Sequence, residues 1–156
     1  MPAEIRRIES SESDLVIDLF NNYRIFYKQP SNIELAKSFI QARLDRNESV
    51  IFVATIKDKT FEVPVGFTQL YPKFSSARAI KIWVLNDLYV ESNYRKQGIG
   101  ERLINTALGY AKDDQANYVE LSTAVDNYTA QKLYESIGFT KQEPSATFFN
   151  YKIDIT

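Results

Sequence analysis

The segment from Leu85 to Leu103 constrains the fold of this chain more than any other. Residues typical of a strand end at Val90, and a short turn leads into Arg95–Gly100, which contains two glycines. Beyond this loop, apolar residues recur at helical spacing: Ile99, Leu103, Ile104, Ala107, Leu108 and Ala111. The sequence therefore predicts a strand, a glycine-containing loop and a helix in immediate succession.

A loop that opens a helix in this way is suited to phosphate. The first N–H groups of a helix lack intrahelical partners, and the helix dipole adds about half a positive charge there. Gly98 and Gly100 have no Cβ, so a ligand can approach the backbone closely. Two common phosphate loops are excluded: there is no Gly-x-x-x-x-Gly-Lys-Ser/Thr run, and Leu103 replaces the third glycine of Gly-x-Gly-x-x-Gly.

Two missing residue types narrow the chemistry. The chain contains no cysteine and no histidine. Disulfides, thiolate metal sites, a Cys nucleophile, a Ser-His-Asp triad and His-ligated zinc are all excluded. Catalysis must use carboxylates, Tyr, Lys, Ser or Thr hydroxyls, backbone groups and water, and we expect no metal.

Composition bounds the class of protein. A chain of 156 residues, 44% apolar and 25% charged, predicts a single globular domain over residues 1–156. The formal net charge of −1 argues against a nucleic-acid partner. No run approaches the roughly 18 apolar residues of a membrane span, and the first residues are too polar for a signal peptide. We therefore expect a cytoplasmic protein with no membrane partner.

Hydrophobic patterning predicts the order β-α-α-β-β-β-α-β-α-β. Strands are expected at residues 3–9, 49–56, 63–71, 79–90, 118–123 and 147–155. Helices are expected between a Ser11 or Ser13 cap and Pro30, after a Ser31–Glu34 capping box, from Ile99 to about Lys112, and over Tyr128–Ile137 with Gly138 as C-cap. The unusual length of the strand at 79–90 invites a β-bulge.

Three motifs in this order resemble the GNAT superfamily of N-acetyltransferases. Arg95–Gly100 matches the acetyl-CoA signature Arg/Gln-x-x-Gly-x-Gly/Ala, and Asn86–Val90 is similar to the strand that precedes it. Asp126–Phe139 resembles Asn-x-x-Ala-x-x-Leu-Tyr-x-x-x-Gly-Phe. The resemblance implies an α/β (α+β) fold in three layers, whose mixed, mostly antiparallel central sheet is flanked by helices and whose strands splay near Val90.

The same resemblance implies acetyl-CoA as co-substrate. Backbone groups of the strand would pair with the pantetheine arm, the loop would hold the diphosphate, and Asn127 would bind the arm. Asp126 or Asn127 could also cap the fourth helix, and Asn127 could do both. Arg95 and Lys96 would favour the diphosphate electrostatically. The implied cofactor-binding residues are Leu88, Tyr89, Val90, Arg95, Lys96, Gln97, Gly98, Ile99, Gly100, Glu101 and Asn127.

Acetyl transfer to an amine needs a base and benefits from an acid. By resemblance, Tyr134 would protonate the departing thiolate; the alternative is a core tyrosine of the fourth helix. The base remains open between Asp87, Asn86 acting through water, and Glu120, and each acid is equally well read as a solvated residue or an ion-pair partner. Polyamine acetyltransferases carry an acidic pair where this chain has Asn86 and Asp87, so polyamine specificity does not transfer.

The acceptor is not defined by the sequence beyond an amine of a small molecule or protein. Tyr23 and Tyr27, which end the first helical stripe, and Asn86 are candidate substrate-binding residues. Transfer of a longer acyl group is one alternative, and a silent CoA-binding regulatory module is another. The aromatic residues Phe148, Phe149 and Tyr151 favour a homodimer.

Overall fold

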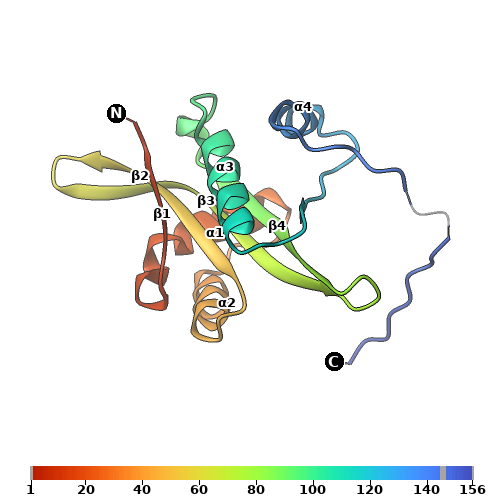
Figure 1. Ribbon diagram of the computed structural model, residues 1–156. Helices are drawn as coiled ribbons and strands as arrows, with labels where there is room; N and C mark the ends of the chain where they lie inside the picture. The colour runs from red at the N-terminus through yellow and green to blue at the C-terminus, as the bar shows by residue number, and fades with distance from the viewer. Residues whose placement is uncertain (1, 145–146, 156) are drawn as a thin grey trace. The chain divides into compact units, whose positions relative to one another are not determined.

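The computed structural model describes residues 2–144 and 147–155 (Figure 1). The chain forms two compact units, Met1–Ser122 and Thr123–Thr156. The first unit contains the sheet and most of the helices, and the described residues of the second unit contain one helix. The expectation of a single domain stays a prediction. Among the described residues, no helix combines the length and apolar character needed to cross a membrane.

The first unit is built on a five-stranded sheet in the order β1-β2-β3-β4-β5. Neighbouring strands pair antiparallel except β4 and β5, which are parallel, so the expected mixed and mostly antiparallel sheet is confirmed. The strands are β1 (Glu4–Arg7), β2 (Val50–Asp58), β3 (Phe61–Ser75), β4 (Ile80–Val90) and β5 (Val119–Glu120).

Helices cover both faces of this sheet, as expected from the resemblance (Figure 1). On one face, Phe20 of α1 (Ile17–Phe26) and Ile40 of α2 (Ile33–Asp45) share a buried cluster with Phe67 of β3. On the other face lies α3 (Ile99–Asp113), which buries the stripe predicted for it except Leu108, which is half-buried. The ring of Tyr110 packs edge-on against those of Phe52 and Trp83, with centroids 5.9 and 5.4 Å apart.

The helix starts differ from the expected ones because other side chains do the capping. A 3-10 helix, η1 (Ser10–Leu15), precedes α1, and a reciprocal Glu9–Glu12 capping box opens it in place of Ser11 or Ser13. At α2 the cap is the Asn32 side chain, which accepts from the Leu35 N–H at 3.0 Å. The Ser31 hydroxyl, expected to cap α2, instead accepts from Asn21.

A bulge in β4 confirms the expectation drawn from its length. Gln69 of β3 lies opposite Asp87, whereas the next β3 residue, Leu70, lies opposite Leu85, so Asn86 is the extra residue. The bulge shifts the alternation of side chains. Leu85 and Asp87 therefore lie on opposite faces of the sheet, with Asp87 toward α1 and α2.

The strand β5 is shorter than the expected 118–123. Within the described residues, its ladder with β4 consists of Trp83 opposite Val119 and Val84 opposite Glu120. Since β4 continues to Val90, its last residues extend beyond β5. The ladder between the two strands thus ends before the segment where splaying was expected.

The second unit contains α4 (Tyr128–Ile137) with the expected caps. The Asn127 side chain accepts from the Ala130 N–H at 3.1 Å, and Gly138 ends the helix at φ +125°. The strand expected at 147–155 is wrong, because these residues carry no regular structure. Alternating apolar and polar residues form a strand only where the edge of a neighbouring strand pairs with them. The local sequence pattern does not show whether such an edge is present.

Two glycines allow a matched test of the close packing between β3 and β4. A Cβ at Gly66 would lie 3.0 Å from the Tyr89 carbonyl oxygen and 3.2 Å from Val90 Cγ2, whereas a Cβ at Gly109, within α3, would meet nothing within 4 Å. We expect Gly66→Ala to lower the free energy of unfolding by about 1–3 kcal/mol through overpacking. Gly109→Ala should raise it by up to about 1 kcal/mol through helix propensity.

Urea titration of both variants measures the two changes. Equal effects of the two substitutions would contradict the close approach of β4 to Gly66.

Candidate active site

The loop before α3 has the backbone geometry of an anion site. Gly98 is the N-cap of α3 at φ +80°, and Lys96 also has a positive φ of +62°. A Cβ on Gly98 would meet nothing within 4 Å, so the left-handed conformation rather than crowding favours glycine here. The N–H groups of the first turn of α3, from Ile99 to Glu101, have no intrahelical acceptor, and the open position at Gly98 lies beside them.

The end of β4 presents backbone groups on the side of β5. The Glu91 N–H donates to the Val65 carbonyl on β3 at 2.9 Å. Because backbone groups of successive strand residues point to alternate sides, those of Tyr89 also face β3, and those of Leu88 and Val90 face away from it. The Arg95 Nε–H donates to the Val90 carbonyl oxygen at 2.7 Å, which is consistent with a Val90 carbonyl that points away from β3. An extended ligand could pair with this edge as an added strand does.

Arg95 ties the glycine loop to β4 and α1. Besides its bond to Val90, its guanidinium carbon lies 5.5 Å from the ring centroid of Tyr89 and 5.9 Å from that of Phe26. Both distances are within the range of cation–π attraction. The side chain expected to favour the diphosphate is thus engaged with the strand end in this structure.

Asp87 is a buried carboxylate held by two amide donors. Its side chain is only 2% exposed. The Gln69 Nε2 group donates to Asp87 Oδ2 at 2.6 Å, and the Asn86 Nδ2 group donates to Oδ1 at 2.7 Å. The Tyr23 hydroxyl lies 3.3 Å from the Asn86 carbonyl oxygen and also interacts with the Asp87 carboxylate. Because a hydroxyl has one proton, it can donate to only one of these two acceptors at a time.

Burial governs the electrostatics of this cluster. Burial raises the pKa of Asp87, while the hydrogen bonds from Asn86, Gln69 and Tyr23 act in the opposite direction. Burial and the neighbouring Asp87 charge also raise the pKa of Tyr23 and that of Tyr71. Asp87 is therefore a stronger proton acceptor than a solvated carboxylate, and the two phenols stay neutral at physiological pH.

The candidate acceptor residues lie beside this carboxylate. The rings of Tyr23 and Tyr27 are 4.9 Å apart at the end of α1, and Tyr27 is exposed while Tyr23 packs against the core. The structure thus brings together Asp87, Asn86 and Tyr23, which the sequence suggested separately, and places Tyr27 next to them. Sequence reasoning missed Gln69; its signal was a polar residue within an apolar strand run.

Glu120 has a different environment. It lies on β5 opposite Val84, and its carboxylate pairs with Lys73 Nζ at 2.9 Å on the surface. This is the ion-pair alternative expected for Glu120. Between the two acids, the buried Asp87 has the setting in which catalytic carboxylates are usually found.

The two candidates of the second unit make contacts within that unit. Asn127 uses Oδ1 to cap α4, which is compatible with its Nδ2 group acting as a donor elsewhere. The Tyr134 ring lies edge-on to Phe139, with centroids 6.1 Å apart. Asn127 therefore has the capping role that the sequence offered as an alternative, whereas Tyr134 is half-buried rather than a core residue. The roles of both residues toward a ligand stay predictions.

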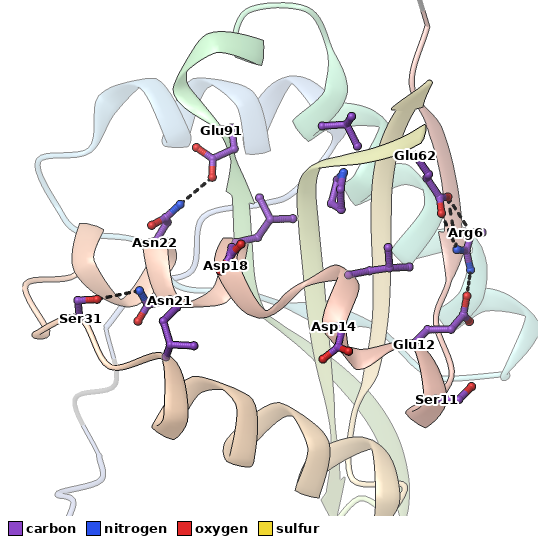
Figure 2. Close-up of a pocket in the computed structure, with 15 residues that line it drawn as sticks. Arg6, Ser11, Glu12, Asp14, Asp18, Asn21, Asn22, Ser31, Glu62 and Glu91 are labelled. Carbon is purple, nitrogen blue, oxygen red and sulfur yellow. Dashed lines mark hydrogen bonds and ion pairs between the residues drawn. The ribbon is translucent and has the colours of Figure 1, made fainter. Parts of the chain in front are cut away.

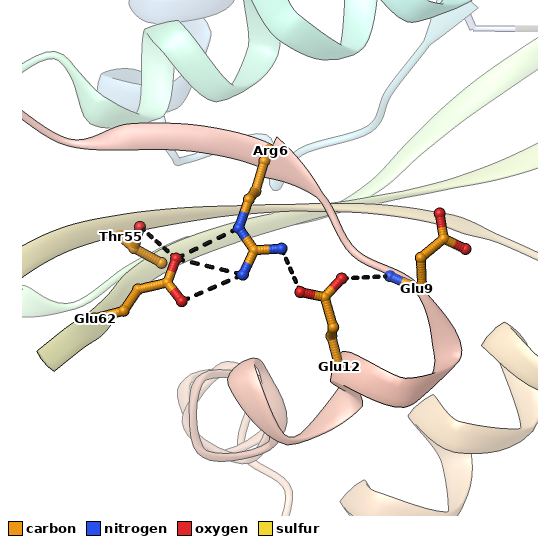
Figure 3. A network of polar contacts seen from close by, with 5 residues as sticks. All are labelled: Arg6, Glu9, Glu12, Thr55 and Glu62. Carbon is orange, nitrogen blue, oxygen red and sulfur yellow. Dashed lines mark hydrogen bonds and ion pairs between the residues drawn. The ribbon is translucent and has the colours of Figure 1, made fainter.

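A cavity of about 980 Å³ lies away from this carboxylate cluster, between β1, η1, α1 and the first residues of β3 (Figure 2). Arg6 bridges Glu12 and Glu62 on one side of it (Figure 3), and Asn22 donates to Glu91 on the other at 2.8 Å. The Arg6 hydrogen bond lowers the pKa of Glu12. Side chains of β1, η1, α1, α2 and β3 contribute to this lining, so no local motif could reveal it. In the described part of the chain, no carboxylates gather as a metal site.

Burial of Asp87 makes a testable contribution to stability. A folded-state pKa above the unfolded value means that stability is lost as pH rises from about 3.9 through the folded pKa, at about 1.4 kcal/mol per unit of difference. Asp87→Asn removes this titration. We expect the free energy of unfolding of the variant, relative to the original chain, to increase between pH 4 and pH 8 in urea titrations. A difference that does not change with pH would contradict burial as the dominant influence on Asp87.

Comparison with known proteins identifies the family. The model of the Acetyltransferase (GNAT) family matches residues 16–139. An uncharacterized N-acetyltransferase of Bacillus subtilis, YhfO, is 38% identical over 151 residues, which cover 97% of each chain. A probable acetyltransferase of Haemophilus influenzae is 29% identical over 147 residues, covering 94% of this chain and 96% of the relative.

Solved structures agree with these matches. The crystal structure of a probable acetyltransferase superposes with a TM-score of 0.84 at 38% identity, covering 98% of both chains. The aminoglycoside N-acetyltransferase AAC(6')-Iy in complex with CoA shares the fold, with a TM-score of 0.73 at 16% identity and coverage of 97% and 95%. This chain belongs to the GNAT family of acetyltransferases and is an acyltransferase enzyme.

Proposed function

We propose that this chain transfers an acetyl group from acetyl-CoA directly to a primary amine, with Asp87 as the base. One observation carries the proposal: the buried Asp87 lies at the β4 bulge, beside the exposed aromatic end of α1 and just before the strand edge at Leu88 and Val90. A base and a candidate cofactor edge are therefore adjacent along one strand.

The cofactor fits the geometry of the loop and the strand end. The open αL turn at Gly98 and the first amides of α3 suit a diphosphate, and Lys96 adds positive charge nearby. The outward backbone groups of Leu88 and Val90 suit the amides of the pantetheine arm. Acetyl-CoA, when bound, supplies an activated thioester, so this chain needs no nucleophile of its own.

Asp87 addresses the main barrier on the acceptor side. An alkylamine with a pKa near 10.4 is neutral in only about one molecule in 10³ at pH 7, so a base must remove the ammonium proton. The N–H bond breaks and the proton passes to Asp87, directly or through a water held by Asn86. The exposed ring of Tyr27 and the half-buried ring of Tyr23 would flank the carbon chain of the amine.

Tyr134 is the proposed acid. It matches the tyrosine of the Leu-Tyr-x-x-x-Gly-Phe motif, and a phenol with a pKa near 10 can protonate a thiolate whose pKa is near 8.5. Asn127, as the first residue of the same motif, would bind the pantetheine arm through its Nδ2 group. A cytoplasmic homodimer stays a prediction, as does acetyl rather than a longer acyl donor.

The assignment of the base can be tested with two acids of this sheet. In an amine-panel screen that measures free CoA, Asp87→Asn should lower kcat/KM for the best amine by about 10²–10⁴-fold, because general-base assistance is lost. Glu120→Gln serves as the control and should change the rate by less than about threefold, since its surface ion pair contributes little. The reverse order would assign the base to Glu120, and no turnover with any amine would favour a silent CoA-binding module.

The role of Tyr134 has a separate signature. Tyr134→Phe should lower kcat about 10- to 100-fold while the Kd for acetyl-CoA, measured by calorimetry, stays within about twofold. Phenylalanine keeps the ring contact with Phe139, so the fold of α4 should be preserved. Unchanged turnover would remove Tyr134 as the acid.

A further inference from the structure

Three buried polar side chains form a row across the centre of the sheet. Ser49 precedes β2, Gln69 lies on β3 and Asp87 on β4, and they are 3%, 0% and 2% exposed. Ser49 Oγ donates to Gln69 Oε1 at 2.7 Å, and Gln69 Nε2 donates to Asp87 Oδ2 at 2.6 Å. The row thus ends at the proposed base.

The order of donors and acceptors in this row is fixed by the ionised carboxylate. An ionised Asp87 only accepts hydrogen bonds, so it requires the Nε2 end of the Gln69 amide. The opposite orientation would place Gln69 Oε1 against a carboxylate oxygen. By donating to Oε1, Ser49 holds the amide in the orientation that Asp87 needs.

The core gives no other reason for a glutamine at this position. A fully buried amide costs free energy unless both ends are paired, and an apolar side chain of similar volume would fill the space without that cost. Gln69 neighbours Leu70, which is also fully buried, and lies opposite Ile51 on β2. Both polar ends of Gln69 are used, one by Ser49 and the other by Asp87.

We propose that Gln69 and Ser49 are positioning residues for the Asp87 carboxylate. Gln69 binds Oδ2 and thereby keeps Oδ1 turned toward Asn86, on the side where the amine is proposed to bind. Ser49 fixes the direction of the Gln69 amide. The catalytic consequence of this arrangement rests on the proposed function, whereas the positioning itself does not.

Proton transfer leaves both positioning residues unchanged. The amine N–H bond breaks and an O–H bond forms at Asp87 Oδ1, while Oδ2 keeps accepting from Gln69.

The other groups that act electrostatically on this cluster are tyrosine phenols and one cation. Tyr23 faces Asp87 from α1 and is itself influenced by Tyr27, Tyr71 lies near Asp87 on β3, and Arg43 of α2 acts on Tyr71.

The first test follows Asp87 itself and needs no substrate. In the unmodified protein, NMR should show the Gln69 side-chain amide and the Asp87 carboxyl carbon titrating with one midpoint. Gln69→Leu should shift the Asp87 midpoint to higher pH, because the ionised form loses a donor. Ser49→Ala should shift it the same way by less. Thr68→Val is the matched control, because Thr68 is equally buried but binds the Asp87 backbone carbonyl at 2.8 Å, and should leave the midpoint in place.

The second test follows the transfer reaction. In Gln69→Leu the acid limb of the kcat/KM profile for the amine should move to higher pH, with kcat at pH 6 lowered about tenfold and the KM for acetyl-CoA within about twofold. Ser49→Ala should show the same changes in smaller measure, which keeps the test valid if Gln69→Leu does not fold.

The outcomes separate this proposal from the proposed function. An Asp87 midpoint that is unmoved in either folded variant, or moved equally by Thr68→Val, would overturn the positioning role. A midpoint that moves while the pH–rate profile stays fixed would support the positioning role and remove Asp87 as the base of the reaction.

Discussion

The structure depends on one costly interaction, the burial of the Asp87 carboxylate within the sheet. An isolated ionised carboxylate is unstable in such a place, and this one is tolerated because amide donors reach both oxygens. Two features of the sequence are explained by the need to pair this carboxylate with donors. The bulge at Asn86 turns Asp87 toward α1, and a paired glutamine replaces an apolar residue in the core.

The same strand joins the two halves of the proposed reaction. Before the bulge, Trp83 and Val84 of β4 are paired with both β3 and β5; beyond the bulge, β4 stays paired with β3 alone, and its other backbone groups face outward. The bulge therefore marks the change from structural to ligand-facing strand. A rigid strand is a suitable support, because proton transfer to a proposed acceptor nitrogen requires a base placed within hydrogen-bond distance.

Features encoded by local patterns were predictable from the sequence. The helices at 99–113 and 128–137, the cap at Asn127 and the β4 bulge follow from spacing, composition and length, and the family followed from motifs. Features that depend on distant partners were not. Asn32 rather than Ser31 caps α2 because Asn21 binds Ser31. The role of Gln69 depends on its hydrogen bonds to Ser49 and Asp87, which are distant in sequence. The tail at 147–155 has the alternation of a strand and does not form one.

The burial of Asp87 also has a consequence for how this protein buffers. Ordinary carboxyl groups titrate near pH 4 and the α-amino group near pH 8, and the interval between them usually belongs to imidazoles and thiols. This chain has neither. Burial displaces the pKa of the Asp87 carboxyl upward, toward this interval with few competing signals. Proton uptake by a single side chain thus becomes accessible to direct potentiometric measurement on the intact protein.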